Sequence, residues 1–122
     1  MKIPLADKEL EVFFKSVVPE EDSINIRPMF GNLAAFVNGN IFTGLYGDDL
    51  FVRLPDGSSA DLLKENGTKS FEPMKGRPMK DYVCVPKEWV GKPELVGPWI
   101  LKSLELTKKL PKKQKKKRAA TK

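Results

Sequence analysis

Apolar residues recur at helical spacing near the start of the chain. Four of them follow the i, i+3, i+4, i+7 pattern of one buried helix face: Leu10, Phe13, Phe14 and Val17. Asp7 precedes this stripe, and its carboxylate can accept a free backbone N–H of the first turn. Pro19 ends the pattern, so the sequence predicts an amphipathic helix between these two residues.

Short apolar runs bounded by turn residues follow, at residues 24–30, 33–37, 40–46 and 50–54. Asn38-Gly39 is typical of a two-residue hairpin loop, because both positions of a type I′ turn take positive φ. Pro28 cannot donate a ladder hydrogen bond, which favours a sheet edge for the first run. Both alternating sets of side chains over 33–37 are apolar, which predicts a central strand covered on both faces. Together the runs predict an antiparallel meander.

The second half of the chain carries more helix and loop signals. In order, the sequence predicts a short helix capped by Ser58 or Ser59 and closed by Asn66-Gly67, a loop over 71–79, a strand over 81–85, a linker over 86–93 and a final helix from Gly97 through Thr107. Antiparallel strands with helices gathered elsewhere are typical of α+β proteins. We therefore expect a two-layer α+β sandwich in which the meander sheet is packed by the N- and C-terminal helices.

Charge divides the chain into two parts. The net charge is +6, but all 16 acidic residues lie within residues 1–107. Nine cations lie beyond that point: Lys108, Lys109, Lys112, Lys113, Lys115, Lys116, Lys117, Arg118 and Lys122. A block of like charges repels itself and has few apolar residues to bury. We expect one folded domain over 1–107, about −3 in net charge, and a disordered basic tail over 108–122.

The composition excludes most catalytic chemistry. The chain has no histidine and one cysteine, Cys84, so it can form neither a Ser-His-Asp nor a Cys-His triad, nor an internal disulfide. A zinc site needs several His or Cys ligands, and we expect no metal and no cofactor. Cys84 lies between two valines in a predicted strand and is interpreted as a buried small hydrophobe. The adjacent acids Asp48 and Asp49 are interpreted as turn residues.

No segment of the sequence is typical of a membrane protein. The first residues lack the apolar stretch of a signal peptide, and no run approaches the ~18 apolar residues of a membrane span. A single, reduced cysteine fits a reducing compartment. These features predict a cytoplasmic protein without membrane insertion.

The order of several short motifs along the chain is informative. They are Arg27-Pro28-Met29-Phe30-Gly31, Gly44-Leu45-Tyr46, Leu50-Phe51-Val52-Arg53-Leu54, Phe71, Gly76-Arg77-Pro78-Met79, Tyr82, Pro86 and Trp99. Together they resemble the N-terminal domain of the TfoX/Sxy family of competence regulators, over about residues 7–107. The resemblance implies an α+β fold with an antiparallel sheet and no catalytic residues.

The same resemblance implies a regulatory role. The family's named regulators act with a transcription activator on DNA-uptake genes, and they carry a second, C-terminal domain. Only the basic tail follows Thr107 in this sequence. We therefore expect a single-domain member of the family, without the C-terminal TfoX domain.

Three arginines are candidates for anion binding: Arg27, Arg53 and Arg77. Two of them lie in segments with Gly and Pro, where backbone N–H groups and a guanidinium can hold an anion together. The alternative interpretation is that each arginine pairs with a local acid or is solvated at the end of a strand. Trp89 lies in a predicted linker and is a candidate partner contact or a lid of the core. The strand aromatics are interpreted as core residues: Phe36, Phe42, Tyr46, Phe51 and Tyr82.

The sequence favours a non-enzymatic interaction or regulatory module. Cations without neighbouring acids can contact phosphates and release counterions, so the tail is expected to bind nucleic acid, or an acidic protein, without sequence preference. A solubilising tail is the alternative. Two other classes stay open: a small-ligand or anion-binding domain (or uncharacterised enzyme) with an arginine-lined pocket, and a homodimer formed through an exposed edge strand near Pro28.

Overall fold

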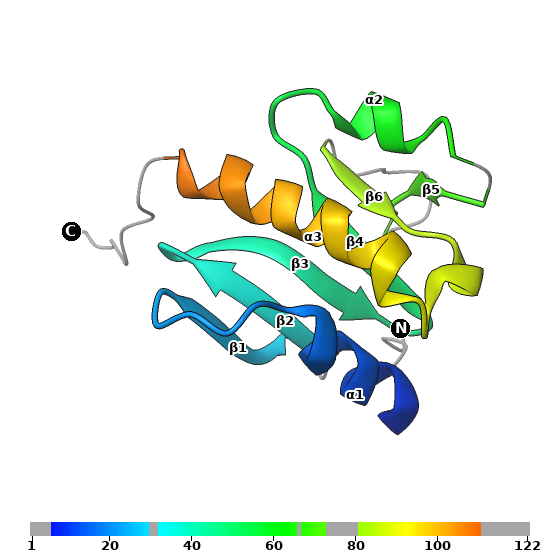
Figure 1. Cartoon of the computed structure of the whole chain (residues 1–122), viewed down its shortest axis with the longest axis horizontal. Helices are drawn as coiled ribbons and strands as arrows, with labels where there is room; N and C mark the ends of the chain where they lie inside the picture. Colours follow the sequence, from blue (N-terminus) through cyan, green and yellow to red (C-terminus); the bar gives the residue numbers. More distant parts are fainter. Residues whose placement is uncertain (1–5, 30–31, 66, 73–80, 111–122) are drawn as a thin grey trace.

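The computed structural model describes residues 6–29, 32–65, 67–72 and 81–110 (Figure 1). The elements are, in order, α1 (Lys8–Val17), β1 (Ile24–Met29), β2 (Asn32–Val37), β3 (Asn40–Tyr46), β4 (Asp49–Arg53), α2 (Ser59–Leu62), β5 (Lys69–Ser70), β6 (Tyr82–Cys84), the 3₁₀ helix η1 (Lys87–Trp89) and α3 (Pro93–Lys108). Most of the predicted loop over 71–79 and most of the predicted tail lie outside the described residues.

The strands form one six-stranded sheet in the order β1-β2-β3-β4-β6-β5, and every neighbouring pair is antiparallel. Helices α1 and α3 cover one face of this sheet, and α3 packs against β3 and β4 (Figure 1). The predicted α+β sandwich and its four-strand meander are therefore confirmed. Strand β5 is absent from the prediction, because two residues are too few to show an alternating pattern.

Helix α1 forms as its apolar spacing predicts. Asp7 is the N-cap, and its Oδ1 atom accepts a 2.8 Å hydrogen bond from the Leu10 backbone N–H. Glu9 and Glu11 lie in the first turn, where the positive end of the helix dipole favours acids. Leu10 and Phe14 are buried, so this face fixes the helix on the sheet.

Two-residue turns join the central strands. Asn38 and Gly39 have φ values of 53° and 78°, as a type I′ turn requires. Gly47, in the turn between β3 and β4, has φ 61°, a conformation that glycine adopts without strain. Among the described strands, β1 pairs with β2 alone, and Pro28 lies opposite Leu33. The predicted hairpin and the predicted edge strand are confirmed.

A β-bulge in β3 allows α3 to hold two strands. The register shifts between Ala35 and Phe36, which leaves Phe42 as an extra residue on β3. In α3, the Ser103 Oγ atom lies 2.6 Å from the carbonyl oxygen of Phe42 and 2.6 Å from that of Arg53 in β4. Ser103 is fully buried and has one proton to donate, so the two carbonyls share it.

Apolar side chains pack on both faces of the sheet. Between the sheet and the helices, the largest buried side chains include Phe14, Phe42, Leu45, Leu50, Leu54, Leu62, Ile100 and Leu104. Strand alternation places Phe51 and Cys84 on the other face, where they pack with Phe71. The Phe51 and Phe71 rings are stacked, with centroids 4.4 Å apart. The sheet therefore has a main core and a smaller aromatic core.

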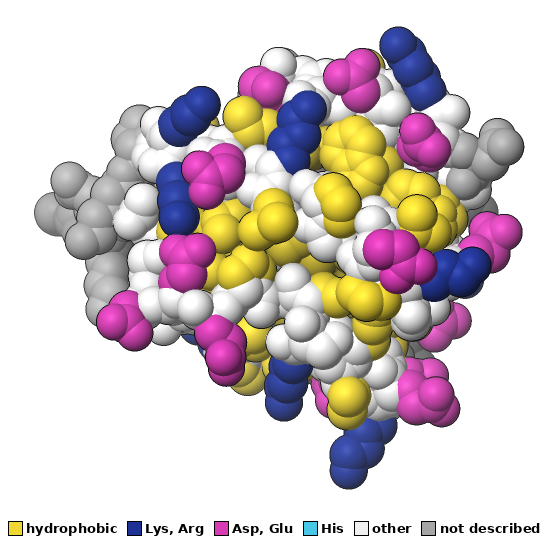
Figure 2. Space-filling model, in the orientation of Figure 1, with side chains coloured by type: hydrophobic (Ala, Val, Ile, Leu, Met, Phe, Trp, Pro, Cys, Tyr) yellow, Lys and Arg dark blue, Asp and Glu magenta, His cyan; other side chains and the backbone are white. Residues whose placement is uncertain are grey.

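The face that carries α1 and α3 shows charged side chains of both signs (Figure 2). Apolar surface lies between them, and Val12 and Leu101 are 61% and 52% exposed. The two signs alternate over this face. The basic excess of the chain is therefore not concentrated there.

Helix α3 is longer than the sequence predicts. It begins at Pro93 rather than Gly97, because proline is tolerated in the first turn, where its missing N–H has no helical partner. Pro98 lies inside the helix and removes a hydrogen bond to the carbonyl of Glu94. Pro98 and Glu94 are both exposed, which leaves that carbonyl open to water.

Helix α2 lacks the predicted serine cap. Ser58 precedes the helix, but its side chain makes no capping hydrogen bond. Instead, its backbone N–H donates to Asp56 Oδ1 at 2.8 Å, and the hydrogen bonds from Ser58 lower the pKa of Asp56. The single turn of α2 is anchored by Leu62, which is fully buried.

Candidate functional site

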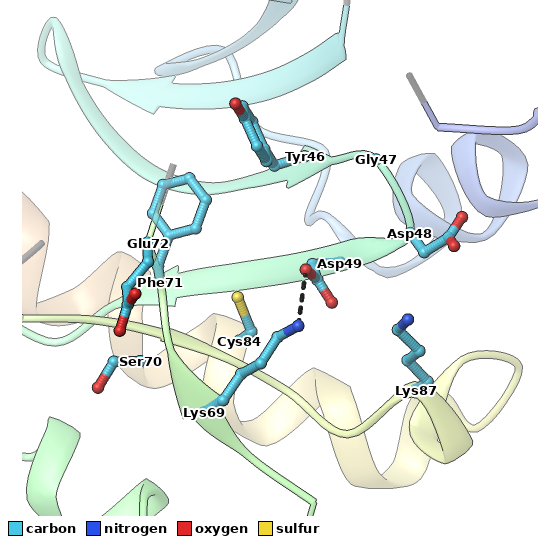
Figure 3. Close-up of a pocket in the computed structure, with 10 residues that line it drawn as sticks. All are labelled: Tyr46, Gly47, Asp48, Asp49, Lys69, Ser70, Phe71, Glu72, Cys84 and Lys87. Carbon is cyan, nitrogen blue, oxygen red and sulfur yellow. Dashed lines mark ion pairs between the residues drawn. The ribbon is translucent and has the colours of Figure 1, made fainter. Parts of the chain in front are cut away.

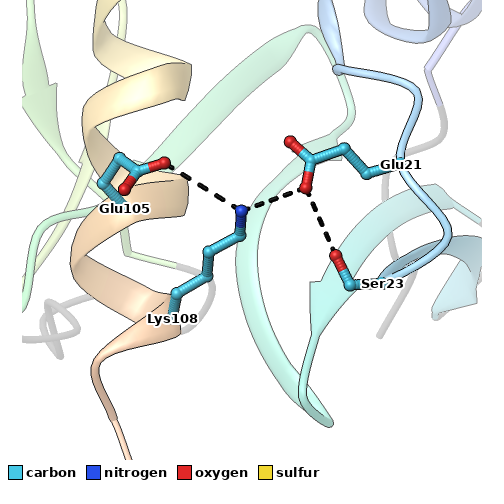
Figure 4. A network of polar contacts seen from close by, with 4 residues as sticks. All are labelled: Glu21, Ser23, Glu105 and Lys108. Atoms are coloured by element: carbon cyan, nitrogen blue, oxygen red, sulfur yellow. Dashed lines mark hydrogen bonds and ion pairs between the residues drawn. The ribbon is translucent and has the colours of Figure 1, made fainter.

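The last turn of α3 carries the first cations of the basic segment. Lys108 ends the helix, and its Nζ atom lies 3.0 Å from Glu21 Oε1 and 4.0 Å from Glu105 Oε2 (Figure 4). Ser23 Oγ donates a 3.3 Å hydrogen bond to the same Glu21 oxygen. The hydrogen bond with Glu21 raises the pKa of Lys108. Lys108 is thus tied to the loop between α1 and β1, whereas Lys109 is exposed and forms no salt bridge with a described residue.

The remaining candidate cations of the tail lie outside the described residues: Lys112, Lys113, Lys115, Lys116, Lys117 and Arg118. The chain leads to them through Leu110, whose backbone N–H donates to the Thr107 carbonyl at 3.0 Å. Helical hydrogen bonding therefore continues past Thr107 as far as Leu110.

A groove of about 510 Å³ lies between the end of α1 and the start of β1. Its lining combines the apolar residues Val18, Pro19, Ile24 and Ile26 with the charged residues Lys15, Glu20, Glu21 and Asp22. Glu21 holds Lys108, while Glu20 and Asp22 are exposed and pair with no cation in the described ranges. Three carboxylates against the ammonium groups of Lys15 and Lys108 leave the groove with a net negative charge.

Among the described residues, Arg27 and Arg53 contact aromatic rings and form no salt bridge. In β1, the guanidinium carbon of Arg27 lies 4.2 Å from the centre of the Phe36 ring. At the end of β4, that of Arg53 lies 5.7 Å from the centre of the Tyr82 ring. Three strand spacings, about 14 Å, separate β1 from β4, so these two arginines do not line one pocket. Arg77 lies outside the described residues.

A pocket of about 490 Å³ lies between the β3–β4 turn, β5, β6 and η1 (Figure 3). It is lined by Tyr46, Gly47, Asp48, Asp49, Lys69, Ser70, Phe71, Glu72, Cys84 and Lys87. Lys69 Nζ lies 3.2 Å from Asp49 Oδ2, and this hydrogen-bonded ion pair raises the pKa of Lys69. Asp48 lies in the turn, as predicted, whereas Asp49 is the first residue of β4. Its ion pair with Lys69 joins β4 to β5 across the intervening strand β6.

Cys84 lies beside this ion pair but offers no nucleophile at neutral pH. It is 1% exposed, and burial raises the pKa of its thiol to about 12. The thiolate is the reactive form of cysteine, so the protonated thiol stays inert. The prediction of a buried small hydrophobe is confirmed. The sequence did not point to Lys69, because its place beside Asp49 depends on the two-residue strand β5.

Four of the five strand aromatics pack in the two cores, whereas Phe36 is only part-buried, belongs to neither core and lies against the Arg27 guanidinium. Phe42 and Phe51 are buried, and Tyr82 makes an edge contact with the Phe51 ring at a centroid distance of 5.8 Å. Phe71 completes this aromatic core, although the sequence places it in a loop. Trp89 lies in η1 and is half-buried against the main core. Of its two interpretations, partner contact and lid of the core, the second agrees with this position.

The described part of the chain holds no group suited to metal chemistry. Within those ranges, no three His, Cys, Asp or Glu side chains come together as a metal site. None of the helices described is long and apolar enough to cross a bilayer. At the end of α3 the described residues present one exposed cation, Lys109, and an acidic groove lies beside Lys108.

Comparison with known proteins gives the family of this chain. A search of curated proteins and a search of solved structures find nothing that matches it. The family model of the TfoX N-terminal domain matches residues 17–106. This range spans the whole sheet and all but the last two residues of α3, including Ser103. Because the match covers well over half of the sequence, the chain belongs to the TfoX N-terminal domain family.

Proposed function

We propose that the protein is a non-enzymatic regulatory module that binds nucleic acid through its cationic segment, residues 109–122. Membership of the TfoX N-terminal domain family suggests a regulatory or competence-associated domain. Charge and geometry, rather than the family, support the nucleic-acid contact.

The separation of charge along the chain carries this proposal. Eight lysines and arginines lie within residues 109–122, and no acid lies among them. Each cation that contacts a phosphate releases counterions, so binding is tight at low salt and weakens steeply as salt rises. Phosphate contacts carry no base information. A sequence-independent, salt-sensitive association follows.

The end of α3 determines where the cationic segment leaves the folded domain. Helix α3 packs on β3 and β4, and Lys108 is held by Glu21. Lys109 is therefore the first cation of the segment that is exposed and outside any described salt bridge. Residues 1–107 carry a net charge of about −3, so they repel the phosphate backbone that the segment attracts.

A small-anion site has less support. Arg27 and Arg53 lie on strands about 14 Å apart, so they do not converge on one anion. In the pocket beside β5, Lys69 already pairs with Asp49, and Cys84 is protonated. These features favour a binding module over an enzyme that uses either group of residues.

Fluorescence anisotropy of labelled oligonucleotides of mixed sequence tests the proposal. We expect the full chain to bind DNA and RNA, with the logarithm of affinity falling linearly as the logarithm of salt concentration rises. A full-length variant with six cations changed to Gln should lose this binding at physiological salt: Lys112, Lys113, Lys115, Lys116, Lys117 and Arg118.

The matched control has the same net charge as this variant, because it changes six exposed lysines of the folded domain to Gln: Lys8, Lys15, Lys64, Lys87, Lys92 and Lys102. This control should bind nearly as tightly as the native chain. Equal binding by all three proteins would overturn the proposal. Binding to an acidic protein but not to oligonucleotides would also overturn it, and would indicate an acidic protein partner instead.

A further inference from the structure

We propose that, when no polyanion is bound, Lys112 and Lys113 dock in the acidic groove between α1 and β1 of their own chain. The groove would thus be a binding site for a lysine-rich segment, occupied by residues 111–122. The docking is a property of the chain alone. Its effect on nucleic-acid affinity rests on the proposed function.

The lining of the groove suits a lysine better than a free cation. A lysine side chain lays its apolar stem along apolar surface and keeps its ammonium group at a charged edge. The groove offers apolar contacts from Val18, Ile24 and Ile26, and free carboxylates from Glu20 and Asp22. Ile26 is 37% exposed, so a lysine stem laid against it would remove apolar surface from water.

Lys108 already makes this type of contact with the groove. Its ammonium lies 3.0 Å from the Glu21 carboxylate, as Figure 4 shows. Glu20 and Asp22 flank Glu21 in the sequence, so their backbones lie about 4 Å from its own. The helical turn continues as far as Leu110. The two residues from Leu110 to Lys112 span at most about 7 Å when extended, and the long lysine side chain adds to that reach towards the carboxylates.

Covalent attachment makes such weak contacts effective. A short linker holds the two sites at an effective concentration in the millimolar range. Exposed charge pairs are screened over about 8 Å at physiological ionic strength, so the docking is reversible and sensitive to salt. Lys15 also lines the groove, but with Glu21 paired to Lys108 the two remaining carboxylates, Glu20 and Asp22, outweigh this one cation.

The docked segment competes with nucleic acid. An ammonium group paired with Glu20 or Asp22 is not available to a phosphate, so the groove lowers the affinity of the segment for short polyanions. A longer or denser polyanion displaces the segment, because it offers more phosphates than the groove offers carboxylates. The groove is therefore an internal competitor that discriminates against weak polyanions.

A nitroxide label at Ala119→Cys in the full chain tests the docking by paramagnetic relaxation. Cys84 is buried and protonated, so the label attaches to the new cysteine. We expect amide signals of residues 20–26 to broaden at low salt, and to recover at about 0.5 M salt, where screening acts within a few ångströms. Signals of α2, on the far side of the molecule in Figure 1, should not broaden.

Paired charge variants separate docking from general electrostatics. The variant Glu20→Gln/Asp22→Asn should lose the broadening and bind oligonucleotides about two- to fivefold more tightly than its control. The control, Asp61→Asn/Glu65→Gln, has the same net charge but neutralises exposed acids at α2, and it should keep the broadening.

Three results would overturn the docking. They are broadening that survives Glu20→Gln/Asp22→Asn, broadening spread evenly over the surface, and broadening that passes from a labelled chain to a separate isotope-enriched chain, which would place the segment of a second copy in the groove. The two proposals fail separately. Docking without oligonucleotide binding removes the proposed function alone, whereas oligonucleotide binding without docking removes this inference alone.

Discussion

The Ser103 hydroxyl oxygen lies 2.6 Å from the carbonyl oxygen of Phe42, 61 residues earlier in the chain. Phe42 is the extra residue of the β3 bulge, so its carbonyl has no regular place in the β2–β3 ladder. The same hydroxyl reaches the carbonyl of Arg53 at the end of β4. One buried side chain of α3 is therefore within hydrogen-bond distance of backbone carbonyls on two neighbouring strands.

Ser103→Ala is expected to destabilise the protein by about 1–3 kcal/mol, because it removes a buried hydroxyl that donates to these backbone carbonyls. Urea unfolding followed by circular dichroism measures the change. Ser16→Ala is the control: the Ser16 hydroxyl also donates to a carbonyl at 2.6 Å, but at an exposed site on α1. Similar losses in the two variants would contradict the role assigned to Ser103.

Gly44→Ala is expected to destabilise the protein by about 1–3 kcal/mol through overpacking. A Cβ at Gly44 would lie 2.7 Å from Phe51 Cζ and 3.3 Å from Ala34 Cβ. The Phe51 ring has little room to retreat, because Phe71 stacks on it at 4.4 Å. Thermal unfolding should show a lower midpoint than in the native protein.

Gly97→Ala is the comparison for Gly44→Ala, because we expect it to raise the stability rather than lower it. Nothing lies within 4 Å of a Cβ at Gly97, which is inside α3. Because glycine is a poor helix former, this variant should gain up to about 1 kcal/mol. A Gly44→Ala protein as stable as Gly97→Ala would show that the Phe51 ring moves freely.

Cys84 is expected to resist alkylation in the folded protein. Burial raises the pKa of its thiol to about 12, so little thiolate forms at mildly alkaline pH, and the side chain is inaccessible. Mass spectrometry after treatment with iodoacetamide should show no adduct on the native chain and one on the chain in denaturant. Rapid modification under native conditions would mean that β6 opens readily.

The same thiol predicts a loss of stability at high pH. Its folded-state pKa of about 12 lies above its ordinary value of 9.0, so the folded state retains a proton that the unfolded state releases. The stabilisation is complete below pH 9 and is lost as the pH rises towards 12, at no more than about 1.4 kcal/mol per pH unit.

Cys84→Ala should remove the part of this loss that begins near pH 9. Burial raises the pKa of Tyr82, and the ion pair with Asp49 raises the pKa of Lys69. The ordinary pKa values of these groups are 10.0 and 10.5, so they change the stability only at a higher pH than Cys84 does. Urea unfolding at a series of pH values compares the two proteins. Parallel curves from pH 9 upward would contradict the assignment to Cys84.

Lys108 and Lys109 should differ in their effect on nucleic-acid binding. Lys109→Gln is expected to reduce the salt-dependence slope for duplex DNA by about 0.9, the value for one phosphate contact. Lys108→Gln should leave the slope nearly unchanged, because Glu21 already holds this ammonium. Anisotropy titrations at several salt concentrations measure both slopes, and equal reductions would show that Glu21 releases Lys108 to the phosphate backbone.

Local signals in the sequence account for most of the fold. Asp7, Asn38-Gly39 and Pro28 each act within a few residues, so their cap, turn and edge are as predicted. The start of α3 was misplaced because Pro93 and Pro98 both suit a first turn, and only packing decides between them. Strand β5 depends on pairing with β6, which no local pattern of two residues reveals.

The candidate site was predictable in charge but not in geometry. The run of cations is visible in the sequence, whereas the contact of Lys108 with Glu21 joins residues 87 positions apart. The groove beside Glu21 likewise depends on the angle between α1 and β1, which the apolar pattern does not specify. The sequence allows a pocket lined by both Arg27 and Arg53. The strand order rules this pocket out, because it places the two residues three strands apart.

The hydrogen bond from Ser103 to the β3 bulge also affects how the protein folds during translation. A nascent chain that ends before residue 103 has all four meander strands, yet the carbonyls of Phe42 and Arg53 still await their donor. The apolar face of the sheet stays uncovered over the same interval, because Ile100 and Leu104 arrive with that serine. The native state therefore forms only after α3 has been synthesised. A chain stalled before α3 would expose the apolar face of the sheet, the kind of surface that aggregates and that chaperones bind.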